Sequence, residues 1–182
     1  MNVTLQKDLF RYEGENSRRI LIKLRYVLFT PGFQFTYCWR KASMARNPIS
    51  KLFWRILHRR CMFHSGIQIP IGTSIGEGFR IGHFGGIVIN PSAIIGRNFS
   101  IAQGALIGSA EGKKKGTPRI GDNVIMSANS VIVGGVNIGD YVMIAPGAFV
   151  NFDVPPHSIV VGIPGRIIPS DHPTHKYNVY TV

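Results

Sequence analysis

Histidine is the side chain of this sequence best suited to proton transfer near neutral pH, because its reference pKa is about 6.5. The chain contains six histidines. His83 stands out by its setting, because it falls inside a six-residue repeat and is followed by Phe84, two glycines and an aliphatic run. Taken alone, a histidine in such a place is most simply a surface residue at a turn. Whether His83 has a chemical role therefore depends on the elements that position it.

The elements around His83 follow a repeat of six residues between positions 69 and 150. One aliphatic residue recurs in each hexad, with a two-residue slip after Ile87 and an interruption after Ile107. A fixed short period of this kind indicates a solenoid and fits neither a helix of period 3.6 nor a plain amphipathic strand. The recurring positions are Ile69, Ile75, Ile81, Ile87, Ile89, Ile95, Ile101, Ile107, Ile120, Met126, Ile132, Ile138, Ile144 and Val150.

Each hexad is predicted to be a short strand followed by a corner. One aliphatic side chain points inward, and a neighbouring glycine permits the backbone angles of a tight corner. Three hexads make a triangular coil of about 18 residues, and stacked coils pair their strands in parallel sheets. The repeat therefore predicts a solenoid of about four to five coils. An ordinary sandwich of short strands is the alternative, which the strict spacing disfavours.

Residues 66–168 resemble the hexapeptide-repeat acyltransferases, and most closely their serine acetyltransferase branch. The matching segments are IGHFGGIVIN (81–90), IAQGALIGS (101–109), PRIGDNVIM (118–126) and VPPHSIVVGIPGRII (154–168). The resemblance implies a mainly β fold, a left-handed parallel β-helix. It also implies a homotrimer that uses acetyl-CoA as co-substrate, bound in the groove between neighbouring subunits.

The resemblance places His83 at the position of the family's catalytic histidine. Its expected role is to deprotonate an acceptor hydroxyl for direct attack on acetyl-CoA, without an acyl-enzyme. A zinc site would instead need three converging histidines. The repeat holds only His83, with His64 at its edge, so we expect no metal.

The resemblance also carries cofactor-binding positions onto this chain. Small residues would let the cofactor approach the backbone, an arginine would pair with a phosphate, and lysines of the loop at 109–118 would act as mobile point charges. Any single glycine is more simply explained by the tight corners of the coil, which need glycine without a cofactor. The lysines are equally well explained as the solvated tip of a loop. These positions are Gly104, Gly108, Lys113, Lys114, Ala128, Ala145, Gly162, Pro164 and Arg166.

Departures from the family pattern bear on the acceptor. In serine acetyltransferases an aspartate stands immediately before the catalytic histidine and helps to hold the amino acid; here that place is Gly82. The aspartate that orients the histidine is replaced by Gln68, and an Arg-His pair by Gly116-Thr117. A zwitterion needs charged partners for its ammonium and its carboxylate, and several of them are missing. The expected acceptor-binding positions are Gln68, Phe84, Asn90 and Thr117.

A neutral acceptor with many hydroxyls needs no such charges. We therefore expect an acetyl-CoA-dependent O-acetyltransferase acting on a sugar hydroxyl of a bacterial surface polysaccharide or its lipid-linked precursor. Basic, aromatic helices before a short solenoid resemble the acetyltransferases of capsule, colanic-acid and O-antigen synthesis. Serine O-acetylation in cysteine biosynthesis is the alternative. A non-catalytic solenoid scaffold is a third, although a scaffold would not need the loop at 109–118.

Charge separates the first 61 residues from the rest of the chain. They carry 13 Lys and Arg against 3 acids, whereas residues 62–182 carry 8 against 6. Amphipathic helical patterns follow Arg18 and Asn47-Pro48. This segment is expected to cap the open end of the solenoid and to contact an anionic membrane or lipid-linked glycan. Nucleic acid is a poorer partner, because no recognition motif accompanies the charge.

The chain therefore divides into a basic helical N-terminal segment (1–61), a β-helix acyltransferase domain (62–168) and a C-terminal tail (169–182). We expect the tail and residues 1–17 to be loose.

The two cysteines, Cys38 and Cys61, form neither a disulfide framework nor a metal-ligand pattern, which favours a reducing cytoplasm. No secretory signal is recognisable, and the longest uncharged run, residues 26–39, is too short to span a bilayer. A cytoplasmic protein is expected, peripheral at the inner membrane face if the N-terminal segment binds lipid.

Overall fold

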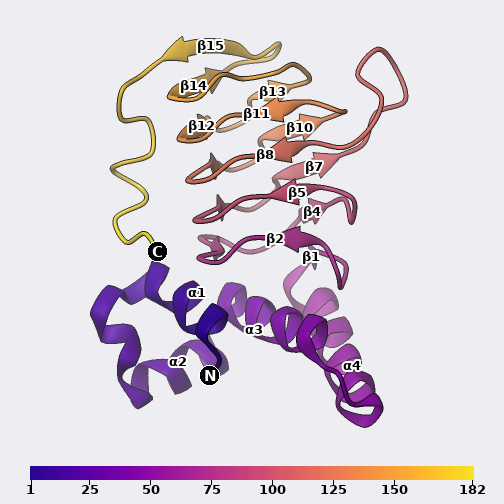
Figure 1. Cartoon of the computed structure of the whole chain (residues 1–182), viewed down its shortest axis with the longest axis vertical. Coiled ribbons are helices and arrows are strands. Elements are labelled where there is room, and N and C mark those ends of the chain that lie inside the picture. The colour runs from indigo at the N-terminus through magenta and orange to yellow at the C-terminus, as the bar shows by residue number, and fades with distance from the viewer.

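The structure, a computed structural model, describes residues 1–182. Four α-helices form one end of the molecule, and a parallel β-helix rises from them (Figure 1). The C-terminal tail, yellow in Figure 1, runs back along the outside of the β-helix towards the helices. The predicted mainly β fold of hexapeptide repeats with an N-terminal helical segment is confirmed, with about five coils.

Three sheets form the sides of the β-helix, and consecutive strands of the chain fall on different sheets. The first sheet holds β1 (Ile67–Gln68), β4 (Ile87–Ile89), β7 (Leu106–Gly108), β10 (Val131–Val133) and β13 (Phe149–Val150). The second holds β2 (Ser74–Ile75), β5 (Ile94–Ile95), β8 (Arg119–Ile120) and β11 (Asn137–Ile138). The third holds β3 (Arg80–Ile81), β6 (Ser100–Ile101), β9 (Ile125–Met126), β12 (Val142–Ile144), β14 (Ser158–Val161) and the antiparallel β15 (Arg166–Pro169).

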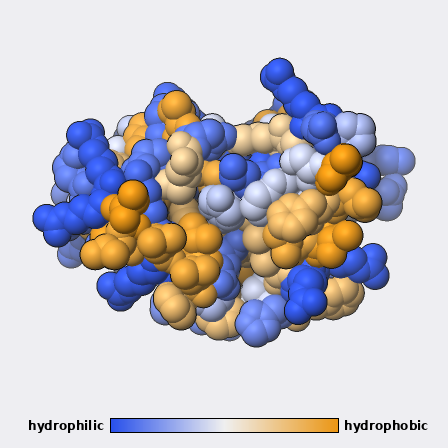
Figure 2. All heavy atoms as spheres, turned by 90° about the horizontal axis from the view of Figure 1, so that it is seen from below, coloured by the Kyte–Doolittle hydropathy of each residue, from blue (hydrophilic) through white to orange (hydrophobic).

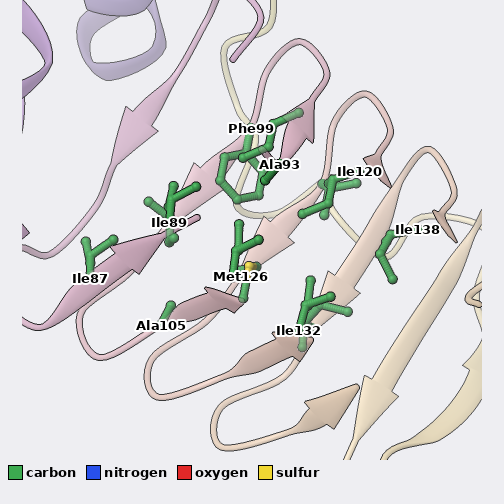
Figure 3. Packing of buried hydrophobic residues seen from close by; sticks show 14 of the residues in the cluster. Ile87, Ile89, Ala93, Phe99, Ala105, Ile120, Met126, Ile132 and Ile138 are labelled. Atoms are coloured by element: carbon green, nitrogen blue, oxygen red, sulfur yellow. The ribbon is translucent and has the colours of Figure 1, made fainter. Parts of the chain in front are cut away.

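The core is the stack of aliphatic residues predicted from the repeat. All the recurring positions between Ile69 and Val150 are buried. Strand register places Ile81, Ile101 and Met126 in one column, each paired with its equivalent one coil away. Figure 3 shows such side chains pointing into the space between the sheets. Since burying one aliphatic side chain contributes about 1.5–3 kcal/mol, this stack fixes the orientation of every hexad.

The two-residue slip in the repeat lies at the corner that carries His83. From β3 to β4 the chain takes eight residues, Ile81 to Ile89, to reach the next matched core position. In the following coil the same path, Ile101 to Ile107, takes six. The extra residues widen the first corner, where Gly85 and Gly86 adopt the positive φ angles that favour glycine.

Helices α1 (Val3–Glu13) and α3 (Pro31–Met44) close the open end of the β-helix. Trp39 of α3 joins the core, and its Nε1 donates to the carbonyl oxygen of Pro70 at 3.0 Å. The prediction that residues 1–17 are loose is wrong. Helix α1 buries Leu5 and Leu9 fully and continues into a short 3-10 helix, Gly14–Arg18. Two apolar side chains in one short helix are too weak a pattern to recognise without the surface they cover.

The helices predicted after Arg18 and after Asn47-Pro48 are present as α2 (Ile20–Phe29) and α4 (Pro48–Ser65). Asn47 caps α4, because its side-chain oxygen accepts from the backbone N–H groups of two residues in the first turn. The apolar faces of both helices are exposed; Leu21 is 77% and Ile49 81% exposed. None of the helices has the length and apolar content required to cross a membrane.

A buried ion pair joins the helices to the first coil. Arg40 of α3 donates from Nε to Oδ2 of Asp8 at 2.9 Å and from Nη2 to Oδ1 at 3.2 Å. Asp8 of α1 also accepts from the backbone N–H of Phe79, and Arg40 donates to the carbonyl oxygens of Ile75 and Gly76. Both side chains are almost fully buried, so each charge depends on the other for compensation.

The C-terminal tail is packed, which corrects the expectation of a loose segment. Asn178 is 8% exposed, and its Oδ1 accepts from Arg11 Nη2 at 2.6 Å and from Ser100 Oγ at 3.1 Å. The side chain of Asn98 exchanges two hydrogen bonds with the backbone of Val182. These contacts hold the tail against both α1 and the second coil.

Asp8→Ala tests the anchoring of the helices. It leaves the buried guanidinium of Arg40 without its partner, which costs about 3–5 kcal/mol of unfolding free energy. Glu15→Ala is the matched control, because the Glu15–Arg18 pair is exposed and such pairs contribute at most about 1 kcal/mol. Urea unfolding measures both. Equal losses in the two variants would contradict the anchoring role of the buried pair.

Candidate active site

His83 lines a cavity of about 450 Å³ on the outer face of the third sheet. Strands β3, β6, β9 and β12 contribute to its wall. The imidazole is solvent-exposed and makes no hydrogen bond with the rest of the chain. Both ring nitrogens can therefore engage a ligand. Larger cavities of about 540 and 840 Å³ lie beside α4, but neither contains His83.

Strand register builds the floor of the His83 cavity. Four of the lining residues come from successive coils and hold equivalent positions, because each directly precedes a residue of the core column. Side chains alternate between the two faces of a strand, so the residue before an inward isoleucine belongs to the outer face. The core column thus determines which side chains surround His83. These residues are Arg80, Ser100, Ile125 and Met143.

The cavity is positively charged and has no acid. Gln103 and Ser127 are neutral polar lining residues, and Arg80 is the one fully charged side chain beside His83. No aspartate or glutamate lines the cavity. A ligand with an ammonium group would therefore find no countercharge on this chain's wall.

The C-terminal tail forms part of the same wall. Tyr177 lines the cavity, and it directly precedes Asn178, which is hydrogen-bonded to Arg11 and Ser100. The tail therefore adds Tyr177 to the wall of the cavity that His83 also lines, although the two residues are far apart in the sequence. Tyr177 is itself 58% exposed, so its ring is accessible to a ligand in the cavity.

Three of the predicted cofactor positions lie in or next to this cavity. Ala128 lines it, Gly104 follows the lining residue Gln103, and Ala145 precedes the lining residue Pro146. Gly104 has a further structural requirement, because a Cβ atom there would collide with the side chain of Asn129 in the next coil. Their cofactor roles stay predictions.

The remaining predicted cofactor positions do not line this cavity. Lys114 pairs with Asp153 at 2.7 Å, which ties the loop to a neighbouring coil, and Lys113 is exposed beside it. Gly108 ends β7 on the first sheet, whereas Gly162, Pro164 and Arg166 lie at the turn between β14 and β15. A single chain does not bring these residues to His83.

The predicted acceptor positions are also dispersed. Phe84 is adjacent to His83 in sequence and 50% exposed, but it does not line the cavity. Gln68 lies on β1, lines the cavity of about 840 Å³ beside α4, and makes no hydrogen bond with His83. Nothing in the chain therefore replaces the family's orienting aspartate.

Asn90 and Thr117 lie together at a different corner. Asn90 Oδ1 accepts from the backbone N–H of Ser92 at 2.9 Å, and Thr117 Oγ1 donates to the Ser92 carbonyl oxygen at 3.1 Å. These bonds fix the base of the 109–118 loop. The acceptor role predicted for the two residues stays a prediction.

The sequence interpretation missed Arg80 and Tyr177. Arg80 could have been found, because a residue that directly precedes a core isoleucine must lie on the outer face of the coil that carries His83. Tyr177 could not, because no periodicity links the tail to the third sheet. His58, also left unassigned, is buried, its Nε2 lies 3.1 Å from the Ile69 carbonyl oxygen, and burial lowers its pKa. No group of three or more His, Cys, Asp or Glu is arranged to hold a metal ion.

Comparisons with known proteins assign the chain to a family. The family model for the bacterial transferase hexapeptide (six repeats) matches residues 117–151. A serine acetyltransferase of Helicobacter pylori is 32% identical over 116 residues, which cover 63% of this chain and 67% of the relative. The chain belongs to the serine acetyltransferase family of hexapeptide-repeat acyltransferases.

Other proteins are similar to this chain. A protein of Escherichia coli named as a putative colanic acid biosynthesis acetyltransferase, WcaB, is 33% identical over 106 residues, covering 56% of this chain and 63% of the relative. The crystal structure of Neisseria gonorrhoeae serine acetyltransferase matches with a TM-score of 0.75 and 27% identity, over 97% of this chain and 67% of that one. The chain spans about half the length of several serine acetyltransferases that it matches.

Asn178→Ala tests whether the tail holds Tyr177 in the cavity wall. The substitution removes the buried acceptor that Arg11 and Ser100 share in Asn178, which costs about 1–3 kcal/mol and frees the tail. Amide hydrogen exchange should accelerate over residues 170–182, whereas the coils stay protected. Lys176→Ala, at an exposed tail position, should leave the exchange unchanged. Slow exchange of the tail in both variants would contradict this anchoring.

Proposed function

We propose that the chain transfers an acetyl group from acetyl-CoA to a hydroxyl group of an acceptor. The observation that carries the proposal is His83, an exposed imidazole without a partner, held on a widened corner beside a cavity. Membership of the serine acetyltransferase family supports acetyl-CoA as the donor. The names of the similar E. coli and H. pylori proteins, all acetyltransferases, agree with this chemistry.

His83 acts as the general base in this proposal. A neutral imidazole nitrogen takes the proton from the acceptor hydroxyl while its oxygen attacks the thioester carbonyl carbon. The tetrahedral adduct then collapses, the carbon–sulfur bond breaks, and the departing thiolate recovers the proton from the imidazolium. The acetyl ester and CoA are the products. The absence of hydrogen bonds to His83 within the chain leaves both nitrogens available for these transfers.

A trimer accounts for the dispersed cofactor positions. Residues such as Gly108, Lys113 and Arg166 do not line the His83 cavity of their own chain. If three chains pack side by side, such residues of one chain would lie near the cavity of the next. Acetyl-CoA would then bind between subunits, with its thioester at His83 and its phosphates near the loop lysines and Arg166.

A sugar hydroxyl is the acceptor that the cavity supports best. The lining residues include no carboxylate that could pair with an amino acid's ammonium group. Polar, uncharged groups such as Gln103 and Ser127 suit hydroxyls instead. A relative named for colanic acid biosynthesis supports the same choice. The expected substrate is a bacterial surface polysaccharide or its lipid-linked precursor.

Serine is the second candidate acceptor, and one observation favours it. Most of the similar proteins are named serine acetyltransferases. Serine O-acetylation would need a carboxylate from a neighbouring subunit or an unusual way of holding the ammonium group. The two candidates share the donor and the base and differ only in the acceptor.

Release of CoA thiol from acetyl-CoA tests both the reaction and the acceptor. His83→Ala should lower kcat about 10²- to 10⁴-fold, because the hydroxyl loses its base, while acetyl-CoA affinity stays unchanged. His64→Ala, outside the cavity, is the control. Near-full turnover of the His83 variant would remove this residue from the mechanism. The assay is run with L-serine, with free sugars and with lipid-linked glycans; turnover with serine alone would overturn the sugar assignment.

We also propose that the helical end of the molecule contacts an anionic membrane surface. The exposed apolar residues of α2 and α4 gather in two patches on the end face that points away from the β-helix (Figure 2). Hydrophilic side chains surround these patches. Residues 1–61 carry a balance of 13 basic to 3 acidic residues. Apolar faces rimmed by Lys and Arg are the combination that binds anionic bilayer interfaces.

Flotation with vesicles tests this membrane contact. The chain should float with vesicles that contain anionic phospholipid and not with purely neutral ones. The double substitution Leu24→Glu and Phe53→Glu, one on each helix face, should abolish flotation because charge is costly in the interface. Ile168→Glu is the matched control, since Ile168 is equally exposed at the far end of the β-helix. Flotation that depends on neither lipid charge nor the helix faces would overturn the contact.

A further inference from the structure

Arg80 is a charged group for which the chain has no partner. Its guanidinium forms no ion pair and no hydrogen bond within the chain, and its Nε is buried without an acceptor. Buried polar groups are almost always satisfied. The Nε of Arg11 also lacks an acceptor, but the Nη groups of Arg11 donate to three acceptors within the chain, whereas the half-buried Arg80 has none. An unpaired guanidinium on the wall of the His83 cavity is therefore placed for a ligand.

The surroundings of Arg80 leave its positive charge uncompensated. Arg11 is a neighbouring cation, and its hydrogen-bond acceptors are all neutral: the Gly78 carbonyl oxygen, Ser100 Oγ and Asn178 Oδ1. Burial, and then the charge of Arg80, lower the pKa of Arg11 to about 10. Two guanidinium groups thus lie close together beside a cavity that no carboxylate lines. Such a site attracts anions.

Stacking on Tyr12 does not account for Arg80. The guanidinium carbon lies 5.4 Å from the centre of the Tyr12 ring, which is a cation–π contact. A cation–π contact uses none of the guanidinium N–H groups as hydrogen-bond donors. The contact with Tyr12 therefore leaves the Arg80 donors available to a ligand.

Arg80 lies close to the backbone that carries His83, so an anion bound by Arg80 would be near the reacting hydroxyl. Its Nη1 lies 3.8 Å from the place where Gly82 would carry a Cβ atom, and Gly82 is bonded directly to His83. Glycine at this position leaves room for the arginine beside the backbone that carries the base. A ligand oxyanion held by Arg80 would lie next to the group that His83 deprotonates.

We propose that Arg80 binds an anionic group of the acceptor, so that the substrate is an acidic sugar bearing a carboxylate or a phosphate near the hydroxyl that is acetylated. The inference rests on the proposed function and narrows its acceptor class. A guanidinium holds either anion through paired N–H donors. It would also pair with the carboxylate of a free amino acid, but no carboxylate lines the cavity to hold the ammonium group of that amino acid, which sets this acceptor apart from serine.

Calorimetric binding of small probes to the full-length chain tests the site. The probes are methyl glucuronide, methyl glucoside and glucose 1-phosphate. An anionic probe should bind about ten- to hundredfold more tightly than the glucoside, the range expected of charge-assisted hydrogen bonds. A preference for the glucuronide identifies a carboxylate as the anion, and a preference for glucose 1-phosphate identifies a phosphate.

Variants separate binding from folding. Arg80→Gln should remove the preference, and Arg80→Lys should restore part of it because the charge returns. Arg119→Gln is the matched control, because Arg119 holds the same hexad position on the second sheet and is exposed. Thermal unfolding confirms that each variant is folded. Equal affinity of the wild-type chain for all three probes, or a preference that survives in Arg80→Gln, would overturn the inference.

Thiol release measured in parallel distinguishes this inference from the proposed function. In the acetylation assay Arg80→Gln should raise KM for the acidic sugar and leave KM for acetyl-CoA unchanged. A raised KM for acetyl-CoA alone would assign Arg80 to the donor and overturn the inference. Anionic preference without turnover of any acceptor would uphold the anion site and overturn the proposed function.

Discussion

One constraint shapes the molecule: each hexad must place a single aliphatic side chain inside the coil and in register with the coil below. Ile81, Ile101 and Met126 satisfy it on the third sheet. Because side chains alternate along a strand, the same register sends the preceding residues to the outer face. The wall of the His83 cavity is therefore a consequence of how the core packs. A slip by one residue would exchange the two sets.

The candidate site lies at the corner where the six-residue spacing is interrupted and where segments distant in the sequence contact the coils. Two additional residues widen the corner after Ile81 and give His83 a place outside the stack. Helices α1 and α3 close the coil beneath it, held by the Asp8–Arg40 pair, and the tail adds Tyr177 from the other end of the chain. The regular coils thus position site residues that come from the widened corner and the C-terminal tail.

These two kinds of structure differ in how far the sequence predicts them. The repeat predicts the coils, the buried column and the exceptional corner, because each depends on residues close together in the chain. Helix α1, the packed tail and the contact of Cys38 with Cys61, whose sulfurs lie 3.3 Å apart, depend on surfaces that exist only after folding. The exposed apolar faces of α2 and α4 are a further example. The amphipathic pattern predicts that these helices form, but it does not predict which surface covers their apolar faces.

The charge of the cavity separates this chain from an enzyme built to hold a zwitterion. Its wall offers a histidine and an arginine, with no acid between them. The account as a whole rests on His83 meeting the thioester. A crystal structure of the chain with CoA measures this most directly. The account predicts that the CoA sulfur lies within about 4 Å of the His83 ring, between two subunits. CoA bound on a face remote from His83, or a monomer that binds no CoA, would contradict it.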